Sequence, residues 1–159
     1  MAEVRSAVNP NDLRRTEQFL HAKIPLTRAM GLRVVAHGES FAVEAPVALN
    51  YNHLHTAFGG SINAVATLAA YTFIWLRVGD ESHVVVREST IRFERPMRDM
   101  IRAHCQEPTA DDLRLFDSAL REKGKGRISL IVVVEEDGAV AAQFSGTFVA
   151  TGIPRRTSE

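Results

Sequence analysis

The sequence predicts an α+β fold in which one antiparallel six-stranded sheet wraps around a single long helix. The first observation behind this prediction is the stretch from Asn50 to Gly79, which passes from a polar loop into an apolar segment. The helix expected from Ser61 to Leu76 is hydrophobic on nearly every face, so it must be buried. The second observation is that β-prone runs flank this helix, and one sheet around one helix buries both apolar surfaces economically.

Before the central helix, the chain is expected to form one short helix and one hairpin. Asn11 or Asp12 is the candidate N-cap of the short, mostly exposed helix, and Pro25 closes it. The turn-like cluster at 37–40 separates two short β-prone runs, which predicts a hairpin. The expected bounds are Asp12–His21 for the helix and Leu32–Ala36 and Phe41–Pro46 for the strands.

After the central helix, the sequence predicts four strands and one helical connection. Thr109 followed by Asp112 is a capping signal, and Asp137-Gly138 is the strongest hairpin turn in the chain. The expected strands are His83–Arg95, Ile101–Gln106, Arg127–Glu136 and Ala139–Ala150, with the helix at Thr109–Glu122. The first of these strands is long enough to pair with its copy across a twofold axis, which predicts a homodimer or a higher oligomer.

Length and composition limit the classes of protein. One domain over residues 1–159 is expected, with a helical extension at 1–25 and a frayed tail at 154–159. The 19 basic residues balance 19 acidic ones, so nucleic acid is not an expected partner. Cys105 is the single cysteine, which precludes an intrachain disulfide and a cysteine-based zinc site and favours a reducing, cytoplasmic location.

No membrane association is expected from the sequence. Acidic residues come early in the chain and no apolar signal region follows them, so a secretory signal is not expected. The central helix is interrupted by Asn63, Thr67 and Thr72 and falls short of roughly 20 uninterrupted apolar residues. We therefore interpret it as a helix buried in protein.

A narrow line of small or polar residues marks the start of the central helix. Gly60, Asn63, Thr67 and Tyr71 follow one another at steps of three and four residues. The glycines allow a substrate to approach the backbone, and the free N–H groups of the first turn favour a carbonyl oxygen or an anion. The alternative is a buried scaffold helix that begins with a glycine turn.

The order of these elements resembles the hotdog thioesterase superfamily, and the local pattern resembles the C-terminal domain of YiiD-type proteins. The resemblance rests on the segments LNYNHLHTAFGGS, HVVVRESTIRFERPM and VAAQFSGTFVATG, and it covers nearly the whole chain after Pro25. It implies an acyl thioester of coenzyme A or acyl carrier protein as substrate, with no separate cofactor and no metal. Similar members include malonyl-acyl-carrier-protein decarboxylases, while many relatives are named only as thioesterases.

The resemblance also implies roles for individual residues. Asn52 stands eight residues before Gly60, where PaaI-like thioesterases place an asparagine beside the thioester carbonyl, and its amide would donate to a developing oxyanion. Asn50 shares that role or fixes the loop, and both asparagines could instead be ordinary turn residues. The backbone N–H of Gly60 or Ser61 is the second expected donor. The other residues expected around the substrate are Thr56, Phe58, Gly59, Asn63 and Thr67.

Two departures from the PaaI-like pattern bear on the chemistry. Phe58 stands where those enzymes usually have histidine, and Thr67 stands where they have a helix carboxylate. Hydrolysis needs a base that activates water, and the expected helix contains none. Decarboxylation of a malonyl thioester needs only donors that stabilise an enolate oxygen, and a water-poor pocket favours loss of the carboxylate charge.

Other residues could supply an acid, a base or a phosphate site. His53 and His55 are the nearest titratable groups to the glycines, although two histidines without a third ligand do not define a metal site. Glu88 could contribute a carboxylate across a dimer, or could be a strand residue paired with Arg87 or Arg92. The residues Lys123, Lys125 and Arg127, beside flexible glycines, are expected to hold carrier phosphates or to form a solvated hairpin entrance.

Together these observations predict a cytoplasmic homodimer that decarboxylates a malonyl thioester. Hydrolysis of an acyl thioester is the alternative enzymatic function. A non-catalytic module that binds acyl thioesters is a third possibility, from which a donor at Asn52 would distinguish an enzyme. The acyl chain, the preferred carrier and the pathway do not follow from the sequence.

Overall fold

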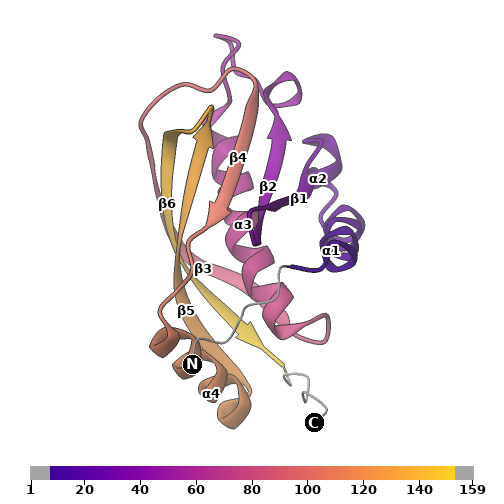
Figure 1. The fold of residues 1–159 in the computed structure, drawn as a ribbon, viewed down its shortest axis with the longest axis vertical. Helices are drawn as coiled ribbons and strands as arrows, with labels where there is room; N and C mark the ends of the chain where they lie inside the picture. The colour runs from indigo at the N-terminus through magenta and orange to yellow at the C-terminus, as the bar shows by residue number, and fades with distance from the viewer. Residues whose placement is uncertain (1–7, 153–159) are drawn as a thin grey trace.

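The computed structural model describes residues 8–152, and it contains the helices and strands expected from the sequence (Figure 1). Their ends differ from the expected bounds by at most two residues. The helices are α1 (Pro10–Lys23), α2 (Leu26–Ala29), α3 (Gly59–Val78) and α4 (Ala110–Lys123), and η1 (Val47–Leu49) is a 3₁₀ turn. The strands are β1 (Arg33–His37), β2 (Ser40–Pro46), β3 (His83–Phe93), β4 (Met100–Cys105), β5 (Lys125–Glu136) and β6 (Ala139–Thr151). The expected tail at 154–159 and the first seven residues lie outside the described range.

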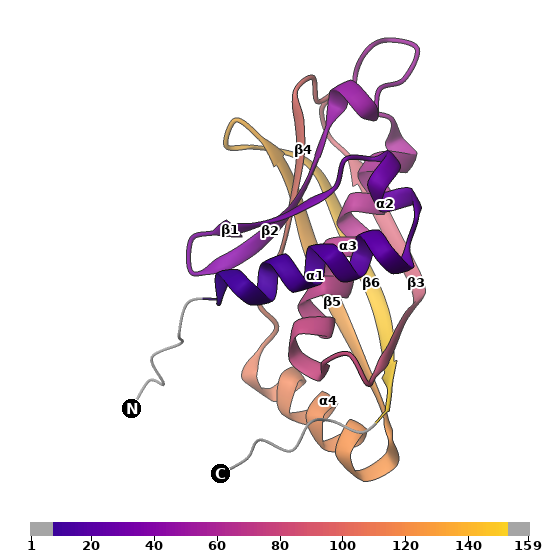
Figure 2. The same ribbon diagram turned by 90° about the vertical axis from the view of Figure 1, so that its right-hand side faces the viewer.

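The six strands form one antiparallel sheet in the order β1-β2-β4-β5-β6-β3. Figures 1 and 2 show this sheet curving around α3. Along β5, alternate residues such as Ile128, Leu130 and Val132 are buried in the core that the sheet shares with α3. The fold class predicted from the sequence is confirmed.

The hydrophobicity of α3 is explained by its position in the core. By length and composition α3 could cross a membrane, yet 56% of its apolar window is buried inside the protein. Val65, Ala66 and Ala69 are fully inaccessible to solvent. Helix α1 crosses over α3 on the side away from the sheet (Figure 2). There the rings of Phe19 and Trp75 stack with centroids 4.9 Å apart. These contacts make α3 the central helix of a globular core, as the sequence predicts.

The N-terminal helix starts earlier than expected because its N-cap is different. Asn9, rather than Asn11 or Asp12, caps α1, and its side chain accepts a hydrogen bond from the backbone N–H of Asn11 at 2.9 Å. Pro10 occupies the first helical position, where its fixed φ suits a helix start. Pro25 closes α1 as predicted but also begins the short helix α2, which the sequence did not predict.

Local turn and cap signals are confirmed. The Thr109 hydroxyl caps α4 by accepting a hydrogen bond from the backbone N–H of Asp112 at 3.1 Å. Asp137 and Gly138 both have positive φ, 53° and 74°, as a two-residue type I′ turn between β5 and β6 requires. The β1–β2 hairpin is also present, and its turn joins His37 to Ser40.

Strand β3 lies at an edge of the sheet and pairs there with β6. It is followed in the chain by β4, which instead pairs with β2 and β5. Val84 is the one buried residue of β3, while Val85 is 59% and Val86 44% exposed. A long edge strand with exposed apolar side chains is a surface on which another strand can pair.

Candidate active site

The segment from Asn50 to Phe58 forms a narrow loop that leads into α3. Its two sides are joined by the hydrogen bonds from Asn52 N to Thr56 O, 2.8 Å, and from Phe58 N to Asn50 O, 2.7 Å. The backbone N–H of Ala57 donates to Met97 O at 2.8 Å, which ties the loop to the segment before β4. The loop that carries the predicted site residues is therefore an ordered hairpin.

The side chain of Asn50 fixes this loop to its surroundings. Asn50 is buried, and its amide nitrogen donates to Met30 O at 2.9 Å and to Pro46 O at 2.8 Å. Both amide hydrogens are thereby used. Of the two roles expected for Asn50, the structure supports loop fixing, because a substrate could receive a hydrogen bond only if one of these bonds broke.

Asn52 organises the tip of the loop. Its Oδ1 accepts hydrogen bonds from the backbone N–H groups of Leu54, at 2.9 Å, and of Thr56, at 3.2 Å. Its amide nitrogen donates to the Thr56 hydroxyl at 3.0 Å. These are the turn hydrogen bonds of the alternative interpretation, but the second amide hydrogen has no partner within residues 8–152. Asn52 can still donate one hydrogen bond to a ligand.

Asn52 and Gly60 lie on opposite sides of the hydrogen bond that joins Phe58 to Asn50. Asn52 is two residues outward from Asn50, toward the loop tip, whereas Gly60 lies in the first turn of α3. Within one protomer, the expected oxyanion donors therefore belong to different parts of the loop and helix. Their convergence on one carbonyl oxygen stays a prediction.

The N-terminus of α3 has no side-chain cap. Phe58 holds the N-cap position, and the first described hydrogen bond into this end runs from Ile62 N to Phe58 O at 3.0 Å. The N–H groups of Gly59, Gly60 and Ser61 precede it and are the ones a helix leaves without internal partners. A carbonyl oxygen or an anion placed there would be stabilised by these donors and by the helix dipole.

Two aromatic rings flank the glycines at the start of α3. A Cβ added to Gly60 would lie 2.5 Å from the Phe58 ring, so only glycine allows this ring position. A Cβ on Gly59 would lie 3.4 Å from the ring of Phe93, the last residue of β3. Phe58 is 55% and Phe93 52% exposed, and both rings border the open backbone. No local sequence pattern marks Phe93 as a site residue, because its approach to Gly59 depends on tertiary structure.

The polar line along α3 is partly buried. The Thr67 hydroxyl donates to the backbone carbonyl of Asn63 at 2.8 Å, which removes it from proton transfer unless this bond breaks. The Asn63 Oδ1 atom is buried and has no partner within residues 8–152. Burial raises the pKa of Tyr71 above its ordinary value, so this residue stays neutral near neutral pH. No carboxylate or histidine lies on α3.

The candidate acids and bases are exposed. His53 and His55 occupy the loop tip, where His55 has a φ of 59° and its ring stacks on Tyr51 with centroids 5.4 Å apart. Glu88 is exposed on β3 beside a register shift, and it makes no ion pair with Arg87 or Arg92 among the residues described. Neither candidate pairing of Glu88 expected within one chain is therefore present.

Lys123, Lys125 and Arg127, the basic cluster, lie at the opposite end of the molecule from the loop. Lys125 pairs with Thr151, which also pairs with His83 at the start of β3. The start of α3, in contrast, lies beside Phe93 at the end of β3. The eleven residues of β3 separate these two ends by roughly 30 Å. One protomer alone does not bring the basic cluster to the N-terminus of α3.

The glycines beside the basic cluster occupy positions that the fold requires. Gly124 ends α4 in the left-handed region, with a φ of 67°, and its N–H donates to Leu120 O at 2.9 Å. Gly126 is buried, and a Cβ there would lie 2.9 Å from the Phe116 carbonyl oxygen. The expected hairpin entrance is thus a short connection between α4 and β5 in which the backbone at Gly126 packs closely against Phe116. The cluster residues themselves are exposed.

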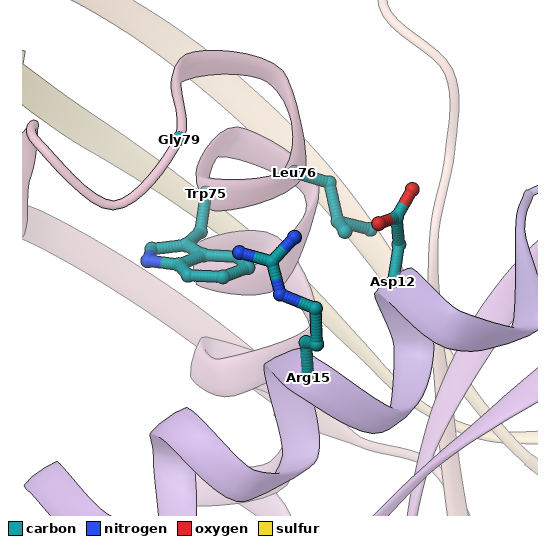
Figure 3. A pocket seen from close by; sticks show the side chains of 5 residues that line it. All are labelled: Asp12, Arg15, Trp75, Leu76 and Gly79. Atoms are coloured by element: carbon teal, nitrogen blue, oxygen red, sulfur yellow. The ribbon is translucent and has the colours of Figure 1, made fainter.

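A small cavity lies at the C-terminal end of α3, away from the loop (Figure 3). Asp12 and Arg15 of α1 line it together with Trp75, Leu76 and Gly79. Because it lies at the end of α3 opposite to Gly60, it cannot hold a thioester at the glycine turn. We therefore place the candidate active site at the loop and the α3 N-terminus, on an open surface of the single protomer.

An antiparallel sheet around one long helix, with a glycine turn at the helix start, defines a hotdog-fold protein of the thioesterase type. The family described as "Putative thioesterase (yiiD_Cterm)" matches residues 13–152. This chain belongs to that family.

Solved structures share the fold. A Chlorobaculum tepidum TLS protein of unknown function is 26% identical, with a TM-score of 0.82 over 92% of this chain and 98% of its own. A protein from Shewanella oneidensis, described as a "putative thioesterase", is also 26% identical, with a TM-score of 0.79 over 92% of this chain and 100% of its own. A Bacillus halodurans protein solved with CoA is 21% identical, with a TM-score of 0.62 over 88% of each chain. These similarities support an acyl-thioester enzyme with the hotdog fold.

Proposed function

We propose that this protein decarboxylates a malonyl thioester carried on coenzyme A or acyl carrier protein. The observation that carries the proposal is the uncapped N-terminus of α3, with its glycine turn, on a helix that contains no carboxylate and no histidine. Donors for a developing oxyanion are present there, whereas a base that would activate water is not. This combination suits a reaction whose product enolate needs stabilisation and whose first step needs no base.

In the proposed reaction, the thioester carbonyl oxygen accepts hydrogen bonds from the Asn52 amide and from the N–H group of Gly60 or Ser61. The bond between the malonyl α-carbon and its carboxylate breaks, carbon dioxide leaves, and the electron pair forms the enolate of the acetyl thioester. The helix N-terminus stabilises the enolate oxygen. A proton from water then adds to the α-carbon and gives the acetyl thioester.

The aromatic rings at this site favour the same step. Phe58 and Phe93 border the glycines, and an apolar surface there would destabilise the charged malonyl carboxylate relative to carbon dioxide. Phe58 also occupies the position at which a hydrolytic relative would have histidine. The replacement of a titratable ring by an apolar ring suits decarboxylation better than hydrolysis.

A homodimer formed through β3 is part of the proposal. The edge position of β3 and its exposed Val85 and Val86 support pairing with a second copy. The candidate loop also exposes apolar side chains, since Tyr51 is 57% and Leu54 66% exposed. A partner that covers these side chains would remove apolar surface from water.

Antiparallel pairing of two β3 strands would also complete the site. The start of β3 in one protomer would lie beside the end of β3 in the other. The basic cluster of one chain would thereby reach the same end of the assembly as the α3 N-terminus of its partner. Carrier phosphates and the thioester could then bind at one place, which the single protomer does not allow.

Coenzyme A and acyl carrier protein both remain candidate carriers. The hotdog-fold protein from Bacillus halodurans was solved with CoA, which supports a carrier of this type for the fold. Acyl carrier protein presents the same phosphopantetheine arm. We place the enzyme in the cytoplasm, where both carriers are found and where the single Cys105 would stay reduced.

Hydrolysis of an acyl thioester is the second candidate function. The description of the family as thioesterases favours it. His53, His55 or Glu88 would then have to activate water, and all three are exposed in the protomer. One of these residues would lie beside the thioester only if the partner subunit supplied it across the dimer interface.

Product analysis distinguishes the two reactions. Malonyl and acetyl thioesters on both carriers are incubated with the protein, and the products are identified by mass spectrometry. We expect malonyl thioester to yield acetyl thioester, and acetyl thioester to be hydrolysed slowly if at all. Rapid release of free thiol from acetyl thioester, lost on replacement of His53, His55 or Glu88, would contradict the proposal and identify a thioesterase.

Two substitutions separate a catalytic role of Asn52 from its role in the loop. Asn52→Ala removes both the amide donor and the Oδ1 acceptor of Leu54 and Thr56, whereas Asn52→Asp keeps an acceptor oxygen and removes the donor. If the donor stabilises the enolate, both variants lose roughly a hundredfold or more in turnover. Activity retained by Asn52→Asp and lost by Asn52→Ala would show that Asn52 acts only on the loop.

Light scattering tests the dimer. The wild-type protein should be dimeric at micromolar concentration, and Val86→Lys, which puts a charge on the edge strand, should dissociate it. Ile131→Lys is the matched control, because Ile131 is 49% exposed on β5, an interior strand of the sheet. A monomeric wild-type protein with full activity would rule out the shared site.

A further inference from the structure

A cluster of metal-binding side chains lies on the outer face of the sheet. His37 ends β1, His104 lies on β4 and Glu135 lies on β5. The candidate ligand atoms of the three residues all lie within 4.8 Å of one another. Because Ala103 is fully buried in the core, its neighbour His104 points to the opposite face of the sheet, away from α3. The cluster is thus separate from the candidate active site.

The three side chains already contact one another. The rings of His37 and His104 stack with centroids 5.0 Å apart and an interplanar angle of 19°. His104 Nε2 lies 3.7 Å from Glu135 Oε2. Two imidazoles and one carboxylate are the donor set of many zinc sites, in which a fourth position is left for water or another ligand.

The neighbouring charges leave Glu135 available. Arg102 lies opposite Glu135 in the β4–β5 register, but its Nε donates to Glu44 Oε1 on β2 at 2.6 Å. The Glu44 charge is thereby paired with Arg102, while Glu135 faces His104. The Glu135 carboxylate is therefore the negative charge that a cation between the two imidazoles would bind.

The geometry permits coordination after a small closure. Zinc binds histidine nitrogen and carboxylate oxygen at about 2.0–2.2 Å, which sets neighbouring ligand atoms about 3.4 Å apart in a tetrahedral site. The present separations of up to 4.8 Å therefore have to shrink by roughly 1.4 Å. His37 adjoins Gly38, around which there is open space, and lies on an edge hairpin, so its ring can move toward the other two.

We propose that His37, His104 and Glu135 form a binding site for one divalent transition-metal ion of the zinc type. The side chains of His104 and Glu135 are 26% and 23% exposed, so an ion can enter and keep a water as its fourth ligand. The bound ion would connect β1, which pairs only with β2 in the described sheet, directly to β4 and β5. The site does not depend on the proposed decarboxylation.

Calorimetry on the untagged full-length protein tests this site. Zinc chloride titrated at pH 7.5 should bind at one ion per chain with a micromolar or lower dissociation constant, and zinc should raise the melting temperature. Cobalt chloride should give the visible absorption bands of a four-coordinate ion. His37→Ala, His104→Ala and Glu135→Gln should each weaken zinc binding at least fiftyfold, because each removes one ligand.

His83→Ala is the matched control, since His83 is an exposed histidine at the start of β3 and should bind zinc as the wild type does. Circular dichroism of each variant establishes that it is folded, and Glu135→Gln keeps the shape of the side chain. The proposal is wrong if the wild type shows no saturable zinc binding. It is equally wrong if folded variants of all three residues bind zinc as tightly as the wild type.

Discussion

Replacement of Glu136 should destabilise the segment that supports the active-site loop. The Glu136 carboxylate accepts hydrogen bonds from three consecutive backbone N–H groups, those of Arg98 at 3.0 Å, Asp99 at 2.8 Å and Met100 at 3.0 Å. Desolvation raises the pKa of this carboxyl, but the bonds from the three N–H groups and the Arg98 charge outweigh it, so the pKa lies below its ordinary value.

This segment holds both ends of the loop region. Asp99 O accepts a hydrogen bond from Val47 N at 2.8 Å, and Met97 O accepts one from Ala57 N at 2.8 Å. Met97 itself is fully buried. The Glu136 side chain thus orders a turn on which η1 and the end of the candidate loop depend.

The magnitude follows from the three bonds. Hydrogen bonds to a charged group contribute about 1.5–3 kcal/mol each, but water can replace those to the exposed Arg98 and Asp99 N–H groups. The Met100 N–H is partly buried and would lose most. We expect Glu136→Ala to lower the free energy of unfolding by about 1–2 kcal/mol, or the melting temperature by roughly 2–8 °C.

Urea denaturation followed by circular dichroism measures this change. Glu136→Gln keeps one acceptor oxygen without the charge and should lose about half as much as Glu136→Ala. Glu122→Ala, at an exposed position of α4, should change stability by less than about 0.5 kcal/mol. If Glu136→Ala is as stable as the Glu122→Ala control, the carboxylate does not hold this turn and the reasoning fails.

Three further predictions concern other parts of the chain. Gly126→Ala should lower the free energy of unfolding by about 1–3 kcal/mol, because the new Cβ would lie 2.9 Å from both the carbonyl oxygen and the ring of Phe116. A variant as stable as the wild type in thermal unfolding would contradict this. Thr109→Ala should lower the free energy of unfolding by about 1 kcal/mol through loss of the α4 cap, whereas Thr109→Ser should keep the cap and the stability. Equal stability of the two variants would exclude capping. Replacement of all three residues of the basic cluster with glutamine should raise KM and leave kcat nearly unchanged, since phosphate contacts are equal in ground and transition states. An unchanged KM in steady-state assays would make the cluster a solvated surface.

The elements of the fold were predictable because their signals are local. The capping pattern of Thr109 and Asp112 and the Asp137-Gly138 turn each lie within a few residues, and both are present in the structure. The N-cap of α1 was predicted wrongly because Asn9, Asn11 and Asp12 are all competent caps, and only the position of Pro10 favours the first. The pairing of β3 with β6 depends on long-range contacts that no local pattern specifies.

The candidate site was predictable only in part. The glycine turn and its free N–H groups follow from the sequence, but the Asn50 amide donates to the carbonyl oxygens of Met30 and Pro46, and the approach of Met30 depends on the folded chain. The same limit applies to Phe93 beside Gly59 and to the cluster of His37, His104 and Glu135, which come from different strands. No sequence spacing brings such residues together.

The position of β3 has a consequence for folding during synthesis. The ribosome completes β3 directly after α3, yet its partner β6 is the last strand within residues 8–152. The apolar run Val84 to Val86 therefore stays without a partner strand until synthesis is nearly finished, and β3 joins the sheet through contacts of high sequence separation, which form slowly. A chain truncated before Ala139 would lack β6, leave β3 without this partner and expose it to aggregation, so the C-terminal hairpin determines when the nascent protein is protected from aggregation.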